Sequence, residues 1–596
     1  MIQRSAKPRE MVRLIAATGL AVALSGCKVG PNYEGPPVTE TPPDFAAVPS
    51  QPVADVKSMP SAADAELASW WKRFEDPTLD SLVARALTGN LDLKLAQARV
   101  KEARAARGII VADWFPAVSA GAAYSRSRSS NNIGFVGPNP PGGIDLYSAG
   151  FDASWELDFW GKTARGVEAA DATIQQTVEN RRDVMVSLLA EVASNYIVLR
   201  GQQERLDVTE HAVKAQEDSL RLTESRFRAG LVGELDVAQA KAQLENRIAQ
   251  IFPINTEIER AINRIGVLLG KPPRAFASEL GPRGRLPAAP SVVNVGMPSE
   301  LLKRRPDIRA AERSLASQTA RIGVATADLY PSFSIGAAFG LQSNQFGSWW
   351  NMSSRYWNIV PGFNWPVLDW GKIKSNIQVQ DARTEQAMII YEQTVLRSFE
   401  DVESSLLQMV SEQQRLGSLN RAVTASSRAV SLAEDLYQTG NVDFRTVLDN
   451  QIVLYNAQDQ AVTSHALTLT SMVSLYKALG GGWETLEQDS WTPTLTPSST
   501  ISAAVEGFGK PQPPSPGEEP GGKAIAPADA PPNTTPAADL QHNRADSTAA
   551  RPSAEPPAQA PAAPGPSNPP STAPAQVAPP APSATPAEKM PPGPRP

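Results

Sequence analysis

Two long stretches of the chain carry apolar residues three or four positions apart, the spacing that places them on one face of a helix. Neither residues 142–252 nor residues 367–492 contain a proline, and both are rich in Ala, Glu, Gln, Arg and Leu, which are common in helices. Leu188, Val192 and Tyr196 show this spacing in the first stretch. We therefore expect long helices in both halves of the chain.

Gly230 and Gly440 are suited to end two of these helices, because glycine readily adopts the left-handed conformation found just after a helix C-terminus. A helix over residues 163–229 would be about 100 Å long at 1.5 Å per residue. A helix of that length needs lateral partners, as in a coiled coil or a tube of helices. The alternative is a bundle of shorter helices, with Gly201 as the best place for a break.

Before each long helical stretch the period of the apolar residues changes from 3.6 to 2. Apolar residues alternate with small or polar ones over residues 147–158 and again over residues 332–341. Each half is expected to contribute a pair of strands, within residues 117–157 and 332–367, of about ten residues each, the length of a transmembrane β-strand. A soluble sheet with one wet face gives the same alternation.

The two halves of the chain repeat each other. The sequence Trp-Gly-Lys occurs at residues 160–162 and again at residues 370–372, an offset of 210. Upstream, Trp-Phe-Pro at residues 114–116 aligns with Leu-Tyr-Pro at residues 329–331, an offset of 215. Further matches hold the first offset constant as far as a Leu-Gly pair that ends each half. This regularity indicates an internal duplication and not a short solenoid repeat.

Four strands cannot span a membrane alone, because an open sheet edge in lipid leaves backbone groups without hydrogen bonds. The smallest membrane barrels have about eight strands. Eight strands leave an interior filled by side chains, whereas twelve leave room for a pore. Two copies of the chain would supply eight strands and three would supply twelve, so transmembrane strands require an oligomer.

The N-terminus joins basic residues to an apolar run over residues 14–24, which closes with Leu24-Ser25-Gly26-Cys27. This is the layout of a secretory signal that is too short to span a bilayer. The position of Cys27 resembles that of the cysteine in a bacterial lipobox, so we expect Cys27 to become a lipidated N-terminus. The alternative is a chance cysteine beside a plain signal, or a cytosolic free thiol. Cys27 is the only cysteine, which excludes an internal disulfide.

Removing residues 1–26 would take away four basic residues and Glu10 and change the formal net charge from −6 to −9. An acidic chain without a basic block is a poor nucleic-acid binder. From residue 509 onward the sequence is dominated by Pro, Ala, Ser and Gly, and we expect it to be disordered. The expected organisation is a signal peptide (1–26), an extended N-terminal segment (27–66), a first repeat (67–280), a second repeat (298–483) and a Pro/Ala-rich tail (509–596).

No catalytic or cofactor-binding pattern is present in the sequence. The histidines, His211, His465 and His542, have no ligand partner at metal spacing. The chain contains no G-x-S-x-G, Walker or dinucleotide-binding motif in a strand–helix context. We therefore expect no enzyme activity, no cofactor and no metal site.

Together these features resemble the outer-membrane factor family, and within it the NodT/OprM-type efflux lipoproteins related to the TolC exit duct. The resemblance rests on the lipobox and the sequence Cys-Lys-Val-Gly-Pro-Asn-Tyr at residues 27–33, on Trp70 and Trp71, and on the duplicated strand pairs and helices. The sequence Leu-Leu-Lys-Arg-Arg-Pro-Asp-Ile at residues 301–308 is particularly characteristic. The resemblance covers residues 27–483, and the Pro/Ala-rich tail is not part of it.

The resemblance implies a mixed α and transmembrane β fold. In this fold a homotrimer shares a twelve-stranded β-barrel, four strands per chain, which continues as a long periplasmic α-helical barrel. It implies a passive exit duct, with a gated periplasmic aperture, in the outer membrane of a Gram-negative bacterium. The duct would dock to a periplasmic adaptor and an inner-membrane pump of RND type. Lys28, where Asp would favour the inner membrane, fits the outer one. The sequence does not name the cargo, because the pump mainly selects it.

The same resemblance implies site residues at the periplasmic end. Asp236 and Tyr437 stand where a carboxylate and a phenol clasp neighbouring helices, and Asp449 stands where aspartates constrict the tunnel. Arg445, four residues before Asp449, can neutralise part of that charge. The alternatives are that Asp236 complements a helix N-terminus, that Tyr437 packs apolarly, and that Arg445 and Asp449 form an ordinary exposed pair.

An alternative function is a periplasmic coiled-coil scaffold that is tethered to the outer membrane and forms no pore. Efflux adaptor proteins also combine a lipid anchor with a helical hairpin. They carry one hairpin between lipoyl-like halves, however, and not two matched copies with strand pairs.

Overall fold

The computed structural model describes residues 28–37, 40–47, 58–61, 67–128, 130 and 143–486. The chain divides into two units, Met1–Thr500 and Ile501–Pro596, and the second unit lies outside the described residues. The expected signal peptide, Cys27 and the expected disordered tail also lie outside them. The description that follows concerns the first unit.

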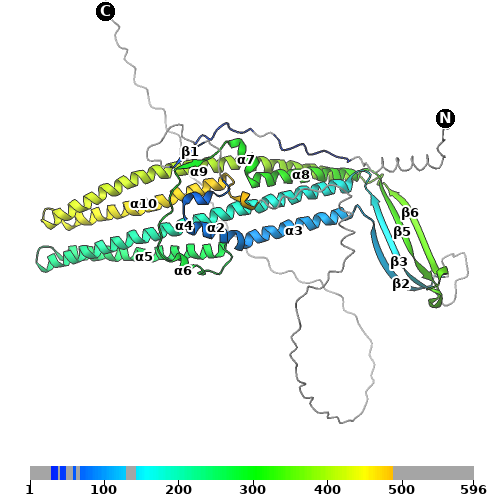
Figure 1. The fold of residues 1–596 in the computed structure, drawn as a ribbon, viewed down its shortest axis with the longest axis horizontal. Helices are drawn as coiled ribbons and strands as arrows, with labels where there is room; N and C mark the ends of the chain where they lie inside the picture. Colours follow the sequence, from blue (N-terminus) through cyan, green and yellow to red (C-terminus); the bar gives the residue numbers. More distant parts are fainter. Residues whose placement is uncertain are drawn as a thin grey trace, which may run out of the picture. The chain divides into compact units, whose positions relative to one another are not determined.

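Two helical hairpins make up most of the described chain (Figure 1). Helices α4 (Lys162–Arg228) and α5 (Glu234–Leu268) form the first hairpin, and α9 (Lys372–Gln438) and α10 (Phe444–Ala478) form the second. Helices α4 and α9 have 67 residues each, which corresponds to about 100 Å. Helix α4 runs through Gly201 without a break, so the expectation of one long helix is confirmed and the alternative of shorter helices is wrong.

Shorter elements precede the strand pairs and connect the hairpins. They are β1 (Met59–Ser61), η1 (Trp70–Phe74), α2 (Pro77–Gly89), α3 (Leu91–Ala112), α6 (Ala277–Leu280), β4 (Val292–Asn294), α7 (Pro298–Arg304), α8 (Pro306–Ala327), η2 (Phe346–Ser348), η3 (Met352–Ser354) and η4 (Trp483–Leu486). Strand β1 pairs in parallel with β4, which links the N-terminal segment to the connection between the two halves.

The element bounds follow the two offsets found in the sequence. Helices α4 and α9 begin 210 residues apart and end 210 residues apart, and so do α5 and α10. Helices α3 and α8, of 22 residues each, are separated by 215 residues at both ends. Each helix of the first set therefore has a counterpart of equal length in the second half.

The main hydrophobic core joins η1 and α2 to the two hairpins. Trp70, 1% exposed, stacks on Tyr476 of α10 with ring centroids 5.1 Å apart. Helix α4 contains an 18-residue window apolar enough to cross a membrane, but 67% of that window is buried inside the protein. Burial of this kind is expected for a core helix, so the window by itself is weak evidence for a membrane span.

A four-stranded antiparallel sheet lies at the end of the helices opposite the hairpin tips (Figure 1). The strand order is β2 (Ala117–Ser127), β3 (Ile144–Leu157), β5 (Ser332–Ser343) and β6 (Arg355–Asn364). The central pair, β3 and β5, joins the two halves of the chain. Strands β2 and β6 form the edges, and within the described residues neither edge pairs with a further strand.

Candidate functional site

The strand register sorts the side chains of the sheet onto two faces, because successive residues of a strand point to opposite sides. One face collects large apolar side chains from all four strands: Val118, Tyr124, Tyr147, Phe151, Trp155, Phe333, Ile335, Phe339, Trp357, Ile359 and Phe363. The opposite face carries serines, glycines and asparagines, together with Asp152 and Glu156. One face is therefore suited to lipid and the other to water.

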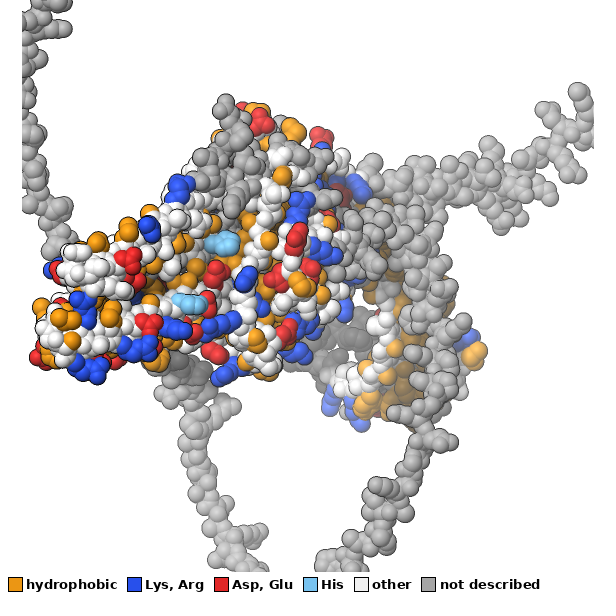
Figure 2. Space-filling view, turned by 60° about the vertical axis from the view of Figure 1, so that its left-hand side comes forward, with side chains coloured by type: hydrophobic (Ala, Val, Ile, Leu, Met, Phe, Trp, Pro, Cys, Tyr) orange, Lys and Arg blue, Asp and Glu red, His pale blue; other side chains and the backbone are white. Residues whose placement is uncertain are grey.

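Within the single chain, no other element covers the apolar face. No residue of β2, β3 or β6 is buried, and Trp357 and Phe363 are 73% and 71% exposed. Figure 2 shows hydrophobic side chains over the sheet and charged side chains among apolar ones at the hairpin tips. A soluble sheet with one wet face would have its apolar face packed against a core. This sheet lacks that packing in the described part of the chain.

Each hairpin turns at one of the two glycines singled out in the sequence. Gly230 and Gly440 follow the C-caps of α4 and α9 with φ of +74° and +79°. The next residue in each turn, Leu231 or Asn441, donates its N–H to the carbonyl five residues earlier at 2.9 Å. This bonding closes the helix C-terminus and needs the left-handed conformation that glycine adopts without strain.

Tyr437 is buried at the tip of the second hairpin, where its ring contacts Phe444 at a centroid distance of 5.5 Å. The guanidinium of Arg226, from the last turn of α4, lies 4.4 Å from the centre of the Tyr437 ring. Arg226 Nη1 also donates to the Tyr437 carbonyl at 2.7 Å. Arg226 therefore joins the two hairpin tips. The sequence reasoning missed this role, for which the only signal was a basic residue near a helix C-terminus.

Asp236 lies in the first turn of α5, where a negative charge complements the helix N-terminus. Within the described chain, no hydrogen bond joins Asp236 to the Tyr437 hydroxyl. Burial raises the pKa of Tyr437; Arg226 and Thr223 act against this rise, and the charge of Asp236 adds to it. The carboxylate is thus near enough to act on the phenol through its charge, but the expected clasp is not formed within one chain.

Arg445 and Asp449 form an i,i+4 pair near the start of α10. Arg445 Nε lies 3.7 Å from Asp449 Oδ2, and the two side chains are 78% and 65% exposed. In the single chain, this is the geometry of an ordinary exposed pair. Nearby Asp443 has a local role that the sequence reasoning missed: its Oδ1 accepts hydrogen bonds from the backbone N–H and the hydroxyl of Thr446, and so caps α10.

The segment that follows Cys27 is held against the start of α4 by Arg165, which is only 1% exposed. The Arg165 guanidinium donates to the carbonyls of Val29 and Gly30 at 3.1 and 3.3 Å and to Asn32 Oδ1 at 2.7 Å. It also pairs with Glu168 at 3.0 Å. Arg165 was not identified from the sequence, because only the fold brings residues 29–32 to it. Cys27 itself lies outside the described residues.

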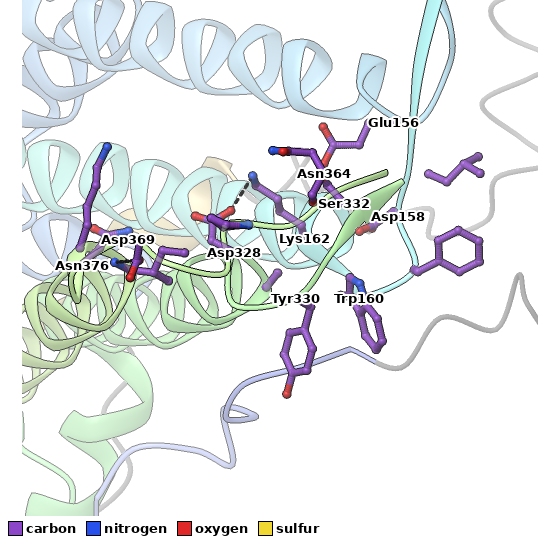
Figure 3. A pocket seen from close by; sticks show the side chains of 16 residues that line it. Glu156, Asp158, Trp160, Lys162, Asp328, Tyr330, Ser332, Asn364, Asp369 and Asn376 are labelled. Atoms are coloured by element: carbon purple, nitrogen blue, oxygen red, sulfur yellow. Dashed lines mark hydrogen bonds and ion pairs between the residues drawn. The ribbon is translucent and has the colours of Figure 1, made fainter. Parts of the chain in front are cut away.

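The same region contains a cleft of about 590 Å³ where the strands meet the helices (Figure 3). Lys162 of the first Trp-Gly-Lys sequence pairs with Asp328 at 2.7 Å. Trp160 stacks on Tyr330, with ring centroids 4.6 Å apart, and its Nε1 donates to the Pro331 carbonyl at 2.8 Å. Both Lys162 and Lys372 line the cleft. Among the described residues there is no group of His, Cys, Asp and Glu that could hold a metal ion.

The sequence matches the family model described as outer membrane efflux protein over residues 82–271 and 297–481. These two stretches correspond to the two halves of the fold. Together they span more than half of the chain.

Among curated proteins, the chain is similar to the pyoverdine export outer membrane protein OpmQ of Pseudomonas aeruginosa, with 32% identity over 71% of this chain and 89% of OpmQ. It is also similar to the probable outer membrane lipoprotein SilC of Salmonella typhimurium, with 30% identity over 77% of this chain and 96% of SilC. Among solved structures, the outer-membrane channel OprN has a TM-score of 0.71 and 34% identity, and the match covers 77% of this chain and all of that one.

Proposed function

The chain belongs to the outer membrane efflux protein family, and we propose that it is the outer-membrane exit duct of a tripartite, RND-type efflux system. Three copies would form a conduit that passively conducts substrates from the periplasm to the outside. The observation that carries the proposal is the uncovered sheet, apolar on one face, polar on the other and open at both edges. In lipid such edges must be closed, because unpaired backbone groups have no water to bind.

The strand directions support closure by further copies of the same chain. The sheet is antiparallel throughout, so β2 and β6 run in opposite directions. Strand β6 of one copy can therefore pair antiparallel with β2 of the next, and repetition of this step closes a barrel without an edge. Three copies give a twelve-stranded barrel, which is wide enough for a pore. The apolar face would contact lipid and the polar face would line the water-filled path.

The long helices support a tube beneath this barrel. The first half of α9 leaves large apolar side chains uncovered, among them Ile389 and Ile390, each 56% exposed, and Leu396, 62% exposed. Helices of about 100 Å need lateral partners. Three copies packed side by side would cover these residues and form the periplasmic helical barrel.

The hairpin tips would form a gated periplasmic aperture. In a trimer, three Asp449 side chains around one axis would repel each other and bind cations, with Arg445 as their counter-ion. The Tyr437 hydroxyl, close to Asp236, could accept or donate a bond when neighbouring copies pack against the tip. A phenol–carboxylate bond of about 1–3 kcal/mol would suit a latch that partner binding opens. The tips would dock to a periplasmic adaptor, itself bound to an inner-membrane pump.

The duct would be anchored by lipid on Cys27 in the outer membrane of a Gram-negative bacterium. Residues 28–32 run along the start of α4, beside the end of β3, which supports an anchor at the level of the sheet. The barrel and the acyl chains would then enter the same membrane.

Heat-modified gel migration and planar-bilayer recording of the purified protein would test the proposed duct. We expect a trimer that resists SDS without heating, dissociates on boiling and conducts ions after insertion. A protein that runs as a monomer without heating, leaves outer-membrane vesicles in carbonate alone and gives no conductance would instead be a tethered coiled-coil scaffold.

A further inference from the structure

The internal repeat reproduces individual hydrogen bonds, not only helix lengths. In the first half, Trp155 Nε1 donates to the Trp114 carbonyl at 3.1 Å. In the second half, Trp365 Nε1 donates to the Leu329 carbonyl at the same distance. The two donors are 210 residues apart and the two acceptors 215, which are the offsets of the repeat. The offsets therefore identify equivalent contacts.

A second set of contacts runs from the first half to the second. Trp160 stacks on Tyr330 and donates to the Pro331 carbonyl, and Lys162 pairs with Asp328 (Figure 3). The donors belong to the first half and the acceptors to the second. The offsets turn this set around, so that its counterpart has donors in the second half and acceptors in the first. The counterpart residues are Trp370 and Lys372 as donors, with Asp113, Phe115 and Pro116 as acceptors.

Within the chain these counterpart residues are exposed. Trp370 is 91% exposed, whereas Trp160 is covered by Tyr330. Lys372, Asp113 and Phe115 are exposed as well. Trp370 also has a φ of +54°, unlike Trp160, so the repeat preserves the side-chain chemistry here and not the backbone. A left-handed backbone is unfavourable for a bulky residue and persists where the surroundings stabilise it.

We propose that Trp370 and Lys372 of one copy bind Asp113, Phe115 and Pro116 of a second copy of this chain. In this clasp the Trp370 ring stacks on Phe115, its Nε1 donates to the Pro116 carbonyl, and Lys372 pairs with Asp113. The clasp rests on the proposed trimer. It repeats between copies the junction that Trp160 and Lys162 form within one copy.

The same offsets assign a strand register between copies. Leu157 of β3 pairs with Phe333 of β5, and their counterparts are Val367 and Val118. Likewise Gly150 pairs with Gly340, and their counterparts are Val360 of β6 and Ser125 of β2. Val360 of one copy therefore lies opposite Ser125 of the next, which continues the sheet into the barrel and brings Trp370 towards Phe115.

Cross-linking between differently tagged copies tests the clasp apart from the trimer. One tagged chain carries Lys372→Cys and the other Asp113→Cys; a second pair of chains carries Val360→Cys and Ser125→Cys. Both pairs are co-expressed in full-length protein and treated with a short bismaleimide, with each single-cysteine chain as a control for Cys27. We expect both pairs to cross-link. Linkage at Val360–Ser125 without linkage at Lys372–Asp113 would overturn the clasp and leave the trimer. Failure of both pairs would overturn the clasp and the trimer together.

Substitutions measure what the clasp contributes. Trp370→Ala is expected to lower the temperature at which the trimer dissociates in SDS, whereas Trp350→Ala, which removes an indole that is 69% exposed in the β5–β6 loop, is expected to leave it unchanged. Lys372→Asp and Asp113→Lys should each lower it, and the double charge reversal should restore it. Equal effects of the two tryptophan substitutions, or no restoration in the double variant, would contradict the clasp.

Discussion

The guanidinium of Arg226 lies 4.4 Å from the centre of the Tyr437 ring and donates to the Tyr437 carbonyl at 2.7 Å. Arg226 ends the first long helix and Tyr437 the second, so this contact ties the two hairpin tips together. It satisfies a carbonyl at the C-terminus of α9 that has no partner within the helix. The tie lies beside the residues proposed to gate the duct.

Loss of the Arg226 tie should loosen the tips. Arg226→Ala removes a cation–π contact and a charge-assisted hydrogen bond, together about 2 kcal/mol. We expect higher single-channel conductance and greater antibiotic sensitivity. Tyr437→Phe keeps the ring and the carbonyl, so within one chain it should change less. An increase after Tyr437→Phe as large as that after Arg226→Ala would mean that the hydroxyl binds Asp236 in the assembled channel.

Asp449 is expected to line the neck of the aperture. Asp449→Ala should weaken the block of the channel by divalent or trivalent cations added from the periplasmic side, because it removes three negative charges around one axis. Asp443→Ala is the matched control, since Asp443 is committed to capping α10. Block of wild-type strength in the Asp449 variant would remove Asp449 from the gate.

The Asp443 cap should depend on pH. Hydrogen bonds from Thr446 hold the pKa of Asp443 below its usual value. A carboxyl group with a depressed pKa stabilises the folded state above its unfolded pKa of about 4, and this contribution is lost as the pH falls through the folded value. Hydrogen-exchange protection of the first turn of α10 should therefore be greater in the wild type than in Asp443→Asn at pH 7. The two proteins should become similar at pH values well below about 4. A difference that persists in acid would contradict the charge-dependent cap.

Arg165 is expected to position the N-terminal segment. Arg165→Ala should release residues 28–32, at a cost of about 3 kcal/mol for several lost bonds to a buried guanidinium. Trypsin should then cleave after Lys28 more rapidly than in the wild type. Arg85→Ala, which breaks an exposed pair with Glu279, should leave the cleavage rate unchanged. Equal rates in the two variants would show that the segment is held by other contacts.

The lipid anchor is tested at Cys27. Mass spectrometry of the mature protein should find Cys27 at the N-terminus with diacylglyceryl and an amide-linked chain. Cys27→Ser should leave the protein uncleaved or without lipid, with only partial loss of transport, because a barrel would still hold the trimer in the membrane. An unmodified cysteine in purified mature protein would contradict the proposed anchor.

The local features of this protein could be predicted from the sequence alone. Apolar spacing identified α4 and the strands, because periodicity depends only on backbone geometry. Gly230 and Gly440 were identified as helix ends because the left-handed conformation is a property of the residue itself. The offsets of 210 and 215 matched the bounds of the helices because copies of one sequence fold into the same elements.

The tertiary structure decided which side chains meet. Arg165 binds residues 29–32 and Arg226 binds Tyr437 across large separations in the chain, and no local pattern encodes either pairing. Trp160 and Trp370 occupy the same Trp-Gly-Lys sequence, yet one stacks on Tyr330 and the other is 91% exposed. The difference arises because the first repeat is followed in the chain by a second one that covers Trp160. No third repeat follows to cover Trp370.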